Sequence, residues 1–271
     1  MKYCPQCGVE LNIQGRFCWQ CGAPLPAADL TAIGIDPQGD LEQQITAGFF
    51  KVLKKNIEEE QDPEKWQAFS ERVYDSGFRD FLQRRVGQVA AKIQSGQGGP
   101  SQSKLITELW ENLSDHFVIS FCPDLSQTVF PEKLLRYLEE DWKHVDLYRM
   151  AMDYLDLAAE PVPHYTDFLA MPVEKLKNAG KTFLKPDKGE RIFLIVDLSI
   201  LGSCQEGFAV TEKGLYWKAQ LNRAHRVTFI GLNNLQKERE WITINGHFFN
   251  AGPSLNIKML KLLKRIKRFL D

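Results

Sequence analysis

The chain has 271 residues, of which 44% are hydrophobic and 25% are charged, the composition of a globular protein with room for two or three domains. The net charge of −1 excludes a molecule that binds nucleic acid through its overall charge. The charge is unevenly spread, because residues 251–271 carry +5 and the rest of the chain carries −6. No run of about 18 apolar residues predicts a transmembrane helix, and no apolar stretch predicts a signal peptide at the start. These features predict a cytoplasmic protein.

Two CxxCG motifs begin the chain, and ten residues separate the first cysteine pair from the second. Two residues between paired cysteines let both thiolates face one point, and two such pairs form the tetrahedral four-sulfur set that suits Zn²⁺. A rubredoxin-type iron site with similar motifs is the alternative. All four positions would be filled by protein, so we expect one structural zinc ion rather than a catalytic one. The predicted ligands are Cys4, Cys7, Cys18 and Cys21.

These motifs resemble the short zinc-ribbon modules found at the N-termini of many bacterial proteins, over residues 3–25. The resemblance implies the same four cysteine ligands and no single function. A ribbon over residues 1–26 is too short to bury a useful core, so metal binding must provide much of its folding free energy.

The side chains around the predicted ribbon leave two binding interpretations. Nucleic-acid binding calls for a basic surface with exposed aromatic rings, whereas charged residues are few here. We therefore favour a structural or protein-docking role over nucleic acid. The residues concerned are Lys2, Arg16 and Glu10, with the aromatic Tyr3, Phe17 and Trp19.

The middle of the chain is predicted to be helical. Prolines and glycines punctuate residues 27–40, which indicates a flexible linker. Residues 41–171 then predict an α-helical domain of about four to six helices. Asp62 is the expected N-cap of one helix, with Pro63 at its first position, and Gly77 marks a kink or a break. Helical patterns cover residues 62–94, 103–121, 131–145, 146–160 and 172–184.

This helical region offers little chemistry. The acidic run Glu139, Glu140, Asp141 points around a helix and is expected to be a solvated face. His116 and His144 are isolated. A Cys122–His116 nucleophile is conceivable, but no surrounding motif supports it, and a buried thiol is favoured. No catalytic residue is nominated, and we expect a protein that is not an enzyme.

From Arg191 onward the pattern changes to short strands. Residues 191–197, 207–211, 215–219, 225–231, 241–244 and 247–251 have strand character. Gly214 is expected to adopt the left-handed conformation of a hairpin bulge, and Asn245-Gly246 is a strong signal for a two-residue hairpin turn. An amphipathic helix over residues 253–270 ends the chain. A sheet curled into a small open barrel, with the helix closing one end, would bury these apolar faces.

At this point the sequence ERIFLIVDLSILGSCQEGFAVTEKGLYWK resembles the core of bacterial pleckstrin-homology-like (PH-like) domains. The resemblance covers about residues 172–270 and implies a β-barrel with a C-terminal helix in residues 172–271. It implies binding of proteins, peptides or lipids rather than catalysis. The expected fold is therefore multidomain α+β, with ribbon, helical domain and PH-like barrel. The residues that carry the resemblance are Glu190, Gly202, Gly207, Phe208, Thr211, Gly214, Tyr216 and Trp217.

Basic residues line the predicted C-terminal helix beside its apolar stripe. This pattern is found in helices that lie on anionic membranes. The favoured interpretation is a capping helix whose charges are solvated, and contact with an anionic lipid surface remains the alternative. The possible contacts are Lys258, Lys261, Lys264, Arg265, Lys267 and Arg268.

Together these features predict a non-enzymatic cytoplasmic interaction or adaptor protein with a structural zinc site and a PH-like binding domain. We expect an unidentified protein partner and no small-molecule substrate. The alternatives are peripheral membrane association through the basic helix and nucleic-acid binding through the ribbon.

Overall fold

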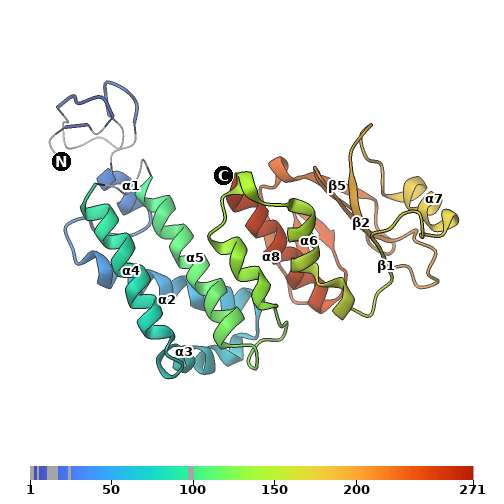
Figure 1. Cartoon of the computed structure of the whole chain (residues 1–271), viewed down its shortest axis with the longest axis horizontal. Coiled ribbons are helices and arrows are strands. Elements are labelled where there is room, and N and C mark those ends of the chain that lie inside the picture. Colours follow the sequence, from blue (N-terminus) through green and yellow to red (C-terminus); the bar gives the residue numbers. More distant parts are fainter. Residues whose placement is uncertain (1–2, 5, 11–17, 24–25, 97–100, 271) are drawn as a thin grey trace. The chain divides into compact units, whose positions relative to one another are not determined.

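The computed structural model describes residues 3–4, 6–10, 18–23, 26–96 and 101–270 (Figure 1). Helices and strands are both present, which confirms the predicted α+β class. The chain divides into two compact units, Met1–Ser126 and Gln127–Asp271. None of the helices in these described ranges is both long and apolar enough to cross a membrane.

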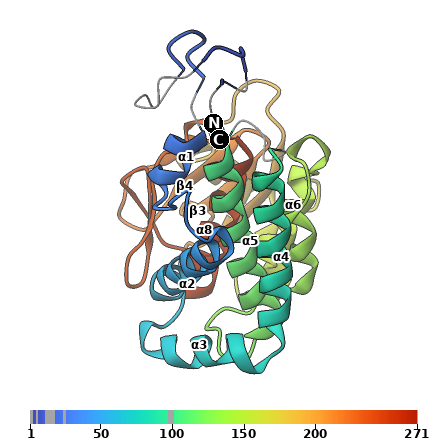
Figure 2. The same ribbon diagram turned by 90° about the vertical axis from the view of Figure 1, so that its left-hand side faces the viewer.

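The first unit holds the cysteine motifs and a group of helices. Helices α2, α4 and α5 lie side by side in both views (Figures 1 and 2), and α3 packs against α4. The elements are α1 (Pro26–Ala32), α2 (Leu41–Glu60), the 3₁₀ turn η1 (Pro63–Lys65), α3 (Trp66–Asp75), α4 (Phe78–Gln94) and α5 (Gln102–Phe121).

Helix α2 shows why these sequences form helices. Its buried residues Ile45, Phe49, Leu53 and Ile57 recur every four positions, which places them on one face. The Asp40 side chain caps the N-terminus by accepting a hydrogen bond from the Gln43 amide at 3.0 Å.

Signals predicted around α3 are confirmed in modified form. Asp62 caps a helix start as expected, but the segment after it is the 3₁₀ turn η1. Gly77 has φ of +79° and interrupts the helical backbone between α3 and α4.

The segment 27–40, expected to be a flexible linker, differs from that prediction. It contains most of α1, and Leu30 and Ile35 are buried in the apolar core of the first unit. The Asp29 carboxylate accepts hydrogen bonds from the amide and the hydroxyl of Ser103 in α5. Burial of these apolar side chains therefore anchors the segment to the first unit, although its prolines and glycines predict a flexible linker.

The second unit begins earlier than the boundary at residue 172 that the sequence suggested. Helix α6 packs on the C-terminal α8, so residues 127–171 belong with the strands. Residues 131–145 were expected to form one α-helix and instead form two 3₁₀ segments. The helical elements are η2 (Glu132–Leu138), η3 (Trp142–His144), α6 (Leu147–Leu155), η4 (Leu157–Ala159), α7 (Val173–Thr182), η5 (Phe229–Gly231) and α8 (Pro253–Leu270).

Two antiparallel sheets form the rest of this unit. The first has the strand order β1-β2-β3-β4-β5, and the second has the order β6-β7-β8. The two-residue β1 and the three-residue β6 have no counterpart among the predicted strands. The strands are β1 (His164–Tyr165), β2 (Ile192–Asp197), β3 (Gly207–Thr211), β4 (Gly214–Lys218), β5 (His225–Thr228), β6 (Leu235–Lys237), β7 (Ile242–Ile244) and β8 (His247–Phe249).

Both faces of the first sheet are covered, so every residue of β3 is buried. On one face, Ala209 and Tyr216 join an apolar cluster with Ala179 of α7. On the other face, Phe208 packs against Phe249 of the second sheet with ring centroids 5.6 Å apart. The indole Nε1 of Trp217 donates a hydrogen bond to the Phe248 carbonyl at 2.8 Å, which links the two sheets.

The two predicted hairpins form, but one glycine acts differently from the prediction. Asn245 and Gly246 have φ of 51° and 80°, as a two-residue hairpin turn requires. Gly214 is not left-handed. It lies so close to β5 that an added Cβ would be 2.1 Å from the Val227 carbonyl oxygen. The position therefore requires glycine because of a close backbone approach rather than an unusual φ.

Candidate metal centre

The first CxxCG motif folds into a tight turn closed by backbone hydrogen bonds. The Cys4 amide donates to the Val9 carbonyl at 2.8 Å, and the Gly8 amide donates to the Cys4 carbonyl at 2.9 Å. An isolated β-bridge pairs Tyr3 with Glu10 and brings the two ends of the turn together. The backbone thus fixes the direction of both thiols in this motif.

The second motif repeats the first turn. The Cys18 amide donates to the Ala23 carbonyl at 2.7 Å, and the Gly22 amide donates to the Cys18 carbonyl at 2.9 Å. Gly8 and Gly22 both have φ of +71°, a conformation that residues with a Cβ rarely adopt. The equal spacing of the two motifs therefore gives two turns of the same shape.

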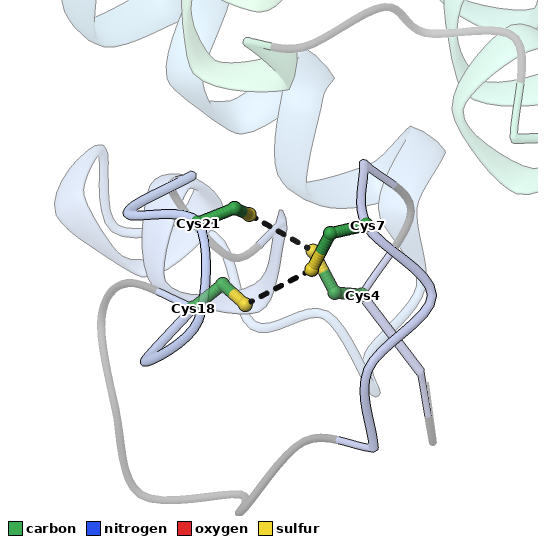
Figure 3. A group of neighbouring side chains, drawn as sticks. All are labelled: Cys4, Cys7, Cys18 and Cys21. Atoms are coloured by element: carbon green, nitrogen blue, oxygen red, sulfur yellow. Dashed lines mark hydrogen bonds between the residues drawn. The ribbon is translucent and has the colours of Figure 1, made fainter.

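The two turns direct four thiols toward one point (Figure 3). The Sγ atoms of Cys4 and Cys21 are 3.7 Å apart, and those of Cys7 and Cys18 are 3.6 Å apart. All four sulfurs lie within 4.8 Å of one another. A tetrahedral ion with metal–sulfur bonds of about 2.3 Å would separate its sulfurs by about 3.8 Å. The four cysteines therefore fit a tetrahedral metal ion such as Zn²⁺.

The electrostatics of the cluster also favour a cation. Burial alone would raise the pKa of the Cys4 thiol, but the amides of Cys7 and Gln6 and the neighbouring thiols lower it to about 6. The amide of Val9 lowers the pKa of Cys7, whereas desolvation and the three neighbouring sulfurs raise it to about 12. Thiols this close resist losing all their protons, and a divalent ion would replace those protons.

The surface of the motifs exposes two aromatic rings. Tyr3 is 55% exposed and Trp19 is 68% exposed. The indole Nε1 of Trp19 donates to the Glu10 carbonyl at 3.3 Å, which ties the second turn to the first. The remaining side chains that bear on nucleic-acid binding, Lys2, Arg16 and Phe17, lie outside the described residues.

The six predicted basic contacts of α8 are not equivalent. Lys258 is 3% exposed, and its Nζ lies 2.6 Å from the Glu160 carboxylate. Lys261 and Arg265 are buried as well. The other three are partly exposed: Lys264, Lys267 and Arg268.

The two remaining cysteines have the features of core residues. Cys122 and Cys204 are both fully buried, and desolvation raises the pKa of each thiol to about 12. The ring of His116 stacks on Phe81 with centroids 4.4 Å apart. Such protonated, inaccessible thiols lack the properties of a nucleophile.

Comparison with protein-family models, with curated proteins and with solved structures found no match for this chain. The function must therefore be argued from the geometry of the sites.

The second unit also contains a cleft that no sequence pattern predicted. The cleft has a volume of 470 Å³ and is lined by residues from four loops, with Phe248 of β8 beside them. Each loop contributes only one to four residues, with no motif spacing, so only the folded chain brings them together.

Proposed function

We propose that this chain is a non-enzymatic interaction or adaptor protein, in which a structural zinc ion holds a small docking module. The observation that carries this proposal is the set of four thiols directed at one point. With all four positions of a tetrahedral ion supplied by protein, the metal has no open position for water or substrate. The bound zinc would supply folding free energy rather than catalysis.

The exposed rings beside the cluster suit a docking surface. Tyr3 and Trp19 are large aromatic side chains, which are enriched where proteins contact each other. Trp19 is also held by its hydrogen bond to Glu10, so its orientation is set by the same fold that the metal would stabilise.

The second unit supports a binding function of the PH-like kind. The meander β2-β3-β4-β5, the second meander β6-β7-β8 and the final helix α8 follow one another in the order that the resemblance implies. We propose that these elements form a PH-like binding domain. The membrane alternative is weaker, because Lys258 is committed to Glu160.

The test is affinity capture with the full chain, compared with its Cys18→Ser variant and with Gln20→Ser in the same turn. We expect specific proteins to be captured by the wild type and by Gln20→Ser, and lost with Cys18→Ser. Mass spectrometry identifies the captured proteins. An absence of specific partners for the wild type would contradict the interaction function, and capture that survives Cys18→Ser would remove the ribbon from it.

A further inference from the structure

The 470 Å³ cleft lies at one end of the strands of the second unit. The loops that line it follow β2, β4, β6 and β8. In an antiparallel meander, alternate strands run in the same direction. The C-terminal ends of β2 and β4 therefore lie at one end of the first sheet, and those of β6 and β8 lie at one end of the second. The cleft is of the size that binds small molecules or short chain segments.

The polar groups of the cleft are amides and one carboxylate. Gln220, Asn222 and Asn250 each have a side-chain amide, which offers both donors and acceptors, as a peptide backbone does. Asn250 is held in place, because its Oδ1 accepts from the Gly252 amide at 3.0 Å and from Asn256 Nδ2 at 2.9 Å. These side chains can hydrogen-bond an extended peptide without a change in the fold.

Of the described residues that line the cleft, Glu240 alone is charged. Its backbone carbonyl accepts from Asn256 Nδ2 at 2.7 Å, which fixes its loop against α8. Within the described residues its carboxylate has no salt bridge. It is therefore placed to receive a cationic side chain from outside.

Large apolar side chains lie beside these polar groups. Leu221, between two cleft residues, is 97% exposed and has φ of 59°, a strained conformation for a bulky residue. Trp241 follows Glu240, is 37% exposed, and packs on Phe248 of the cleft at 5.7 Å. Leu221 therefore offers exposed apolar area beside the cleft that a partner could bury.

The charges of the four loops distinguish between partners. They comprise two arginines and three glutamates, but Glu206 is paired with Lys218 at 3.1 Å, and neither arginine lines the cleft. The cleft itself presents a carboxylate and no cation, which disfavours phosphate groups. An anionic membrane and a nucleic acid are thereby disfavoured. The carboxylate, the amides and the aliphatic rim together match a basic, partly apolar peptide. The charged residues are Glu206, Arg223, Glu238, Arg239 and Glu240.

We propose that this cleft binds an extended peptide segment of a partner protein, with a Lys or Arg side chain at Glu240 and aliphatic side chains against Leu221 and Trp241. The proposal rests on the interaction function proposed above, and it assigns that function to a second site, separate from the cysteine cluster.

The test is fluorine NMR of the full chain with 5-fluorotryptophan at its six tryptophans. The Trp241 signal is assigned with a Trp241→Phe variant. The probes are the capped peptides Leu-Ser-Lys-Ser-Leu and Leu-Ser-Glu-Ser-Leu. We expect the basic peptide to shift the Trp241 signal saturably, and the acidic peptide to bind about tenfold more weakly.

Two variants and two matched controls locate the site. Glu240→Gln removes the preference for the basic peptide, whereas Glu238→Gln, in the same loop but outside the cleft, retains it. Leu221→Asn, which tolerates the positive φ, weakens both peptides about threefold or more. Ile230→Asn removes an equally exposed side chain, 87% exposed in η5, and leaves binding unchanged.

Three results would overturn the proposal: no saturable shift at about 5 mM peptide, equal binding of both peptides, or a preference that survives Glu240→Gln.

Vesicles of phosphatidylcholine and phosphatidylserine are a further arm of the experiment. If the wild type sediments with these vesicles, Leu221→Asn does not, and neither peptide binds, then the exposed apolar side chains beside the cleft contact lipid instead of peptide. Affinity capture with Glu240→Gln separates the two claims, because partners retained by that variant leave the interaction function standing and remove the cleft from it.

Discussion

The two CxxCG motifs (the ribbon) and the second unit, Gln127–Asp271 (the sheet unit), hold their chain segments together by different physical means. In the ribbon, the buried residues of the described part are two ligand cysteines and Ala23. In the sheet unit, Phe208, Trp217 and Phe249 fill the space between two sheets. With the proposed zinc ion bound, the first arrangement would depend on four sulfur atoms and that ion, whereas the second depends on apolar area removed from water. The two regions should therefore respond to opposite perturbations.

Metal removal should have the largest effect, and it should be confined to the ribbon. We expect Cys18→Ser to reduce bound zinc from one ion per chain to almost none. The loss of a binding free energy of about 10 kcal/mol or more would unfold the motifs. Elemental analysis measures the metal, and hydrogen exchange detected by mass spectrometry measures the unfolding.

The matched control is Gln20→Ser, an exposed non-ligand in the same turn. It should retain one ion and native exchange rates. Iron in place of zinc in the purified chain would assign the alternative metal. If the strands of the second unit also lost protection in Cys18→Ser, the contrast between the two regions would be wrong.

A truncation in the core of the sheet unit should destabilise that unit and leave the metal site intact. Phe208 is fully buried and packs on Phe249, so Phe208→Ala should lower the free energy of unfolding of the sheet unit by about 3–5 kcal/mol. Hydrogen exchange of β2–β5 measures the loss locally. The metal content should stay at one ion per chain.

Ile230→Ala serves as the control for that truncation. Its side chain is 87% exposed, so the change should stay within about 0.5 kcal/mol. An equal cost at both positions would mean that the buried interface between the sheets contributes less than its packing indicates.

The same difference explains which features could be predicted from sequence. Cys4 and Cys21 meet through spacing within 18 residues, so the motif alone predicted the cluster. The strands around Phe208 and the Asn245-Gly246 turn were also predicted, because alternation and turn chemistry are local. Interactions within a short stretch of chain can be read from that stretch.

Features that depend on distant partners were missed. Residues 131–145 have a helical pattern, and the buried Leu134, Tyr137 and Leu138 keep the i, i+3, i+4 spacing of an α-helix, yet the segment is a 3₁₀ helix. Lys258 looked like a surface cation until Glu160, 98 residues earlier, supplied its partner. The cleft around Glu240 needs four loops at once. No short stretch of the sequence contains a pattern that would predict any of these features.

A close approach between strands gives a smaller and sharper test of the sheet unit. Gly207 has φ of 149°, and an added Cβ would be 2.0 Å from the Val196 carbonyl oxygen. Gly207→Ala must therefore separate β2 from β3 or distort them, at a cost of about 1–3 kcal/mol. Thermal unfolding of the full chain measures it.

Gly180 is the matched control, because it lies in α7 and an added Cβ meets nothing within 4 Å. Gly180→Ala should leave stability unchanged or raise it by about 0.5–1 kcal/mol, since alanine favours the helix. A destabilisation as large as that of Gly207→Ala would show that the conformation of Gly207 carries no special constraint.

The smallest expected effect concerns a buried carboxylate that ties the start of β2 to the β3–β4 hairpin. Burial alone would raise the pKa of Glu190, but hydrogen bonds from Thr211, the Asp187 amide and Tyr216 outweigh it and hold the pKa below its ordinary value of 4.5. The charged form is thus favoured in the folded chain. Its contribution to stability is present above pH 4.5 and is lost as the pH falls through the lowered pKa.

Glu190→Gln should therefore cost about 1–2 kcal/mol at pH 7, because the charge-assisted part of these hydrogen bonds is removed. The difference between wild type and variant should close as the pH falls below 4.5, since protonated glutamate then resembles glutamine. Urea unfolding from pH 7 to pH 3 measures both chains. Glu212→Gln, in the same hairpin, changes an exposed carboxylate that accepts from the Arg191 amide at 3.2 Å, so it should cost less than Glu190→Gln at pH 7. A difference for Glu190→Gln that stays constant to pH 3 would mean that shape, and not the charge of the carboxylate, holds β2 to the hairpin.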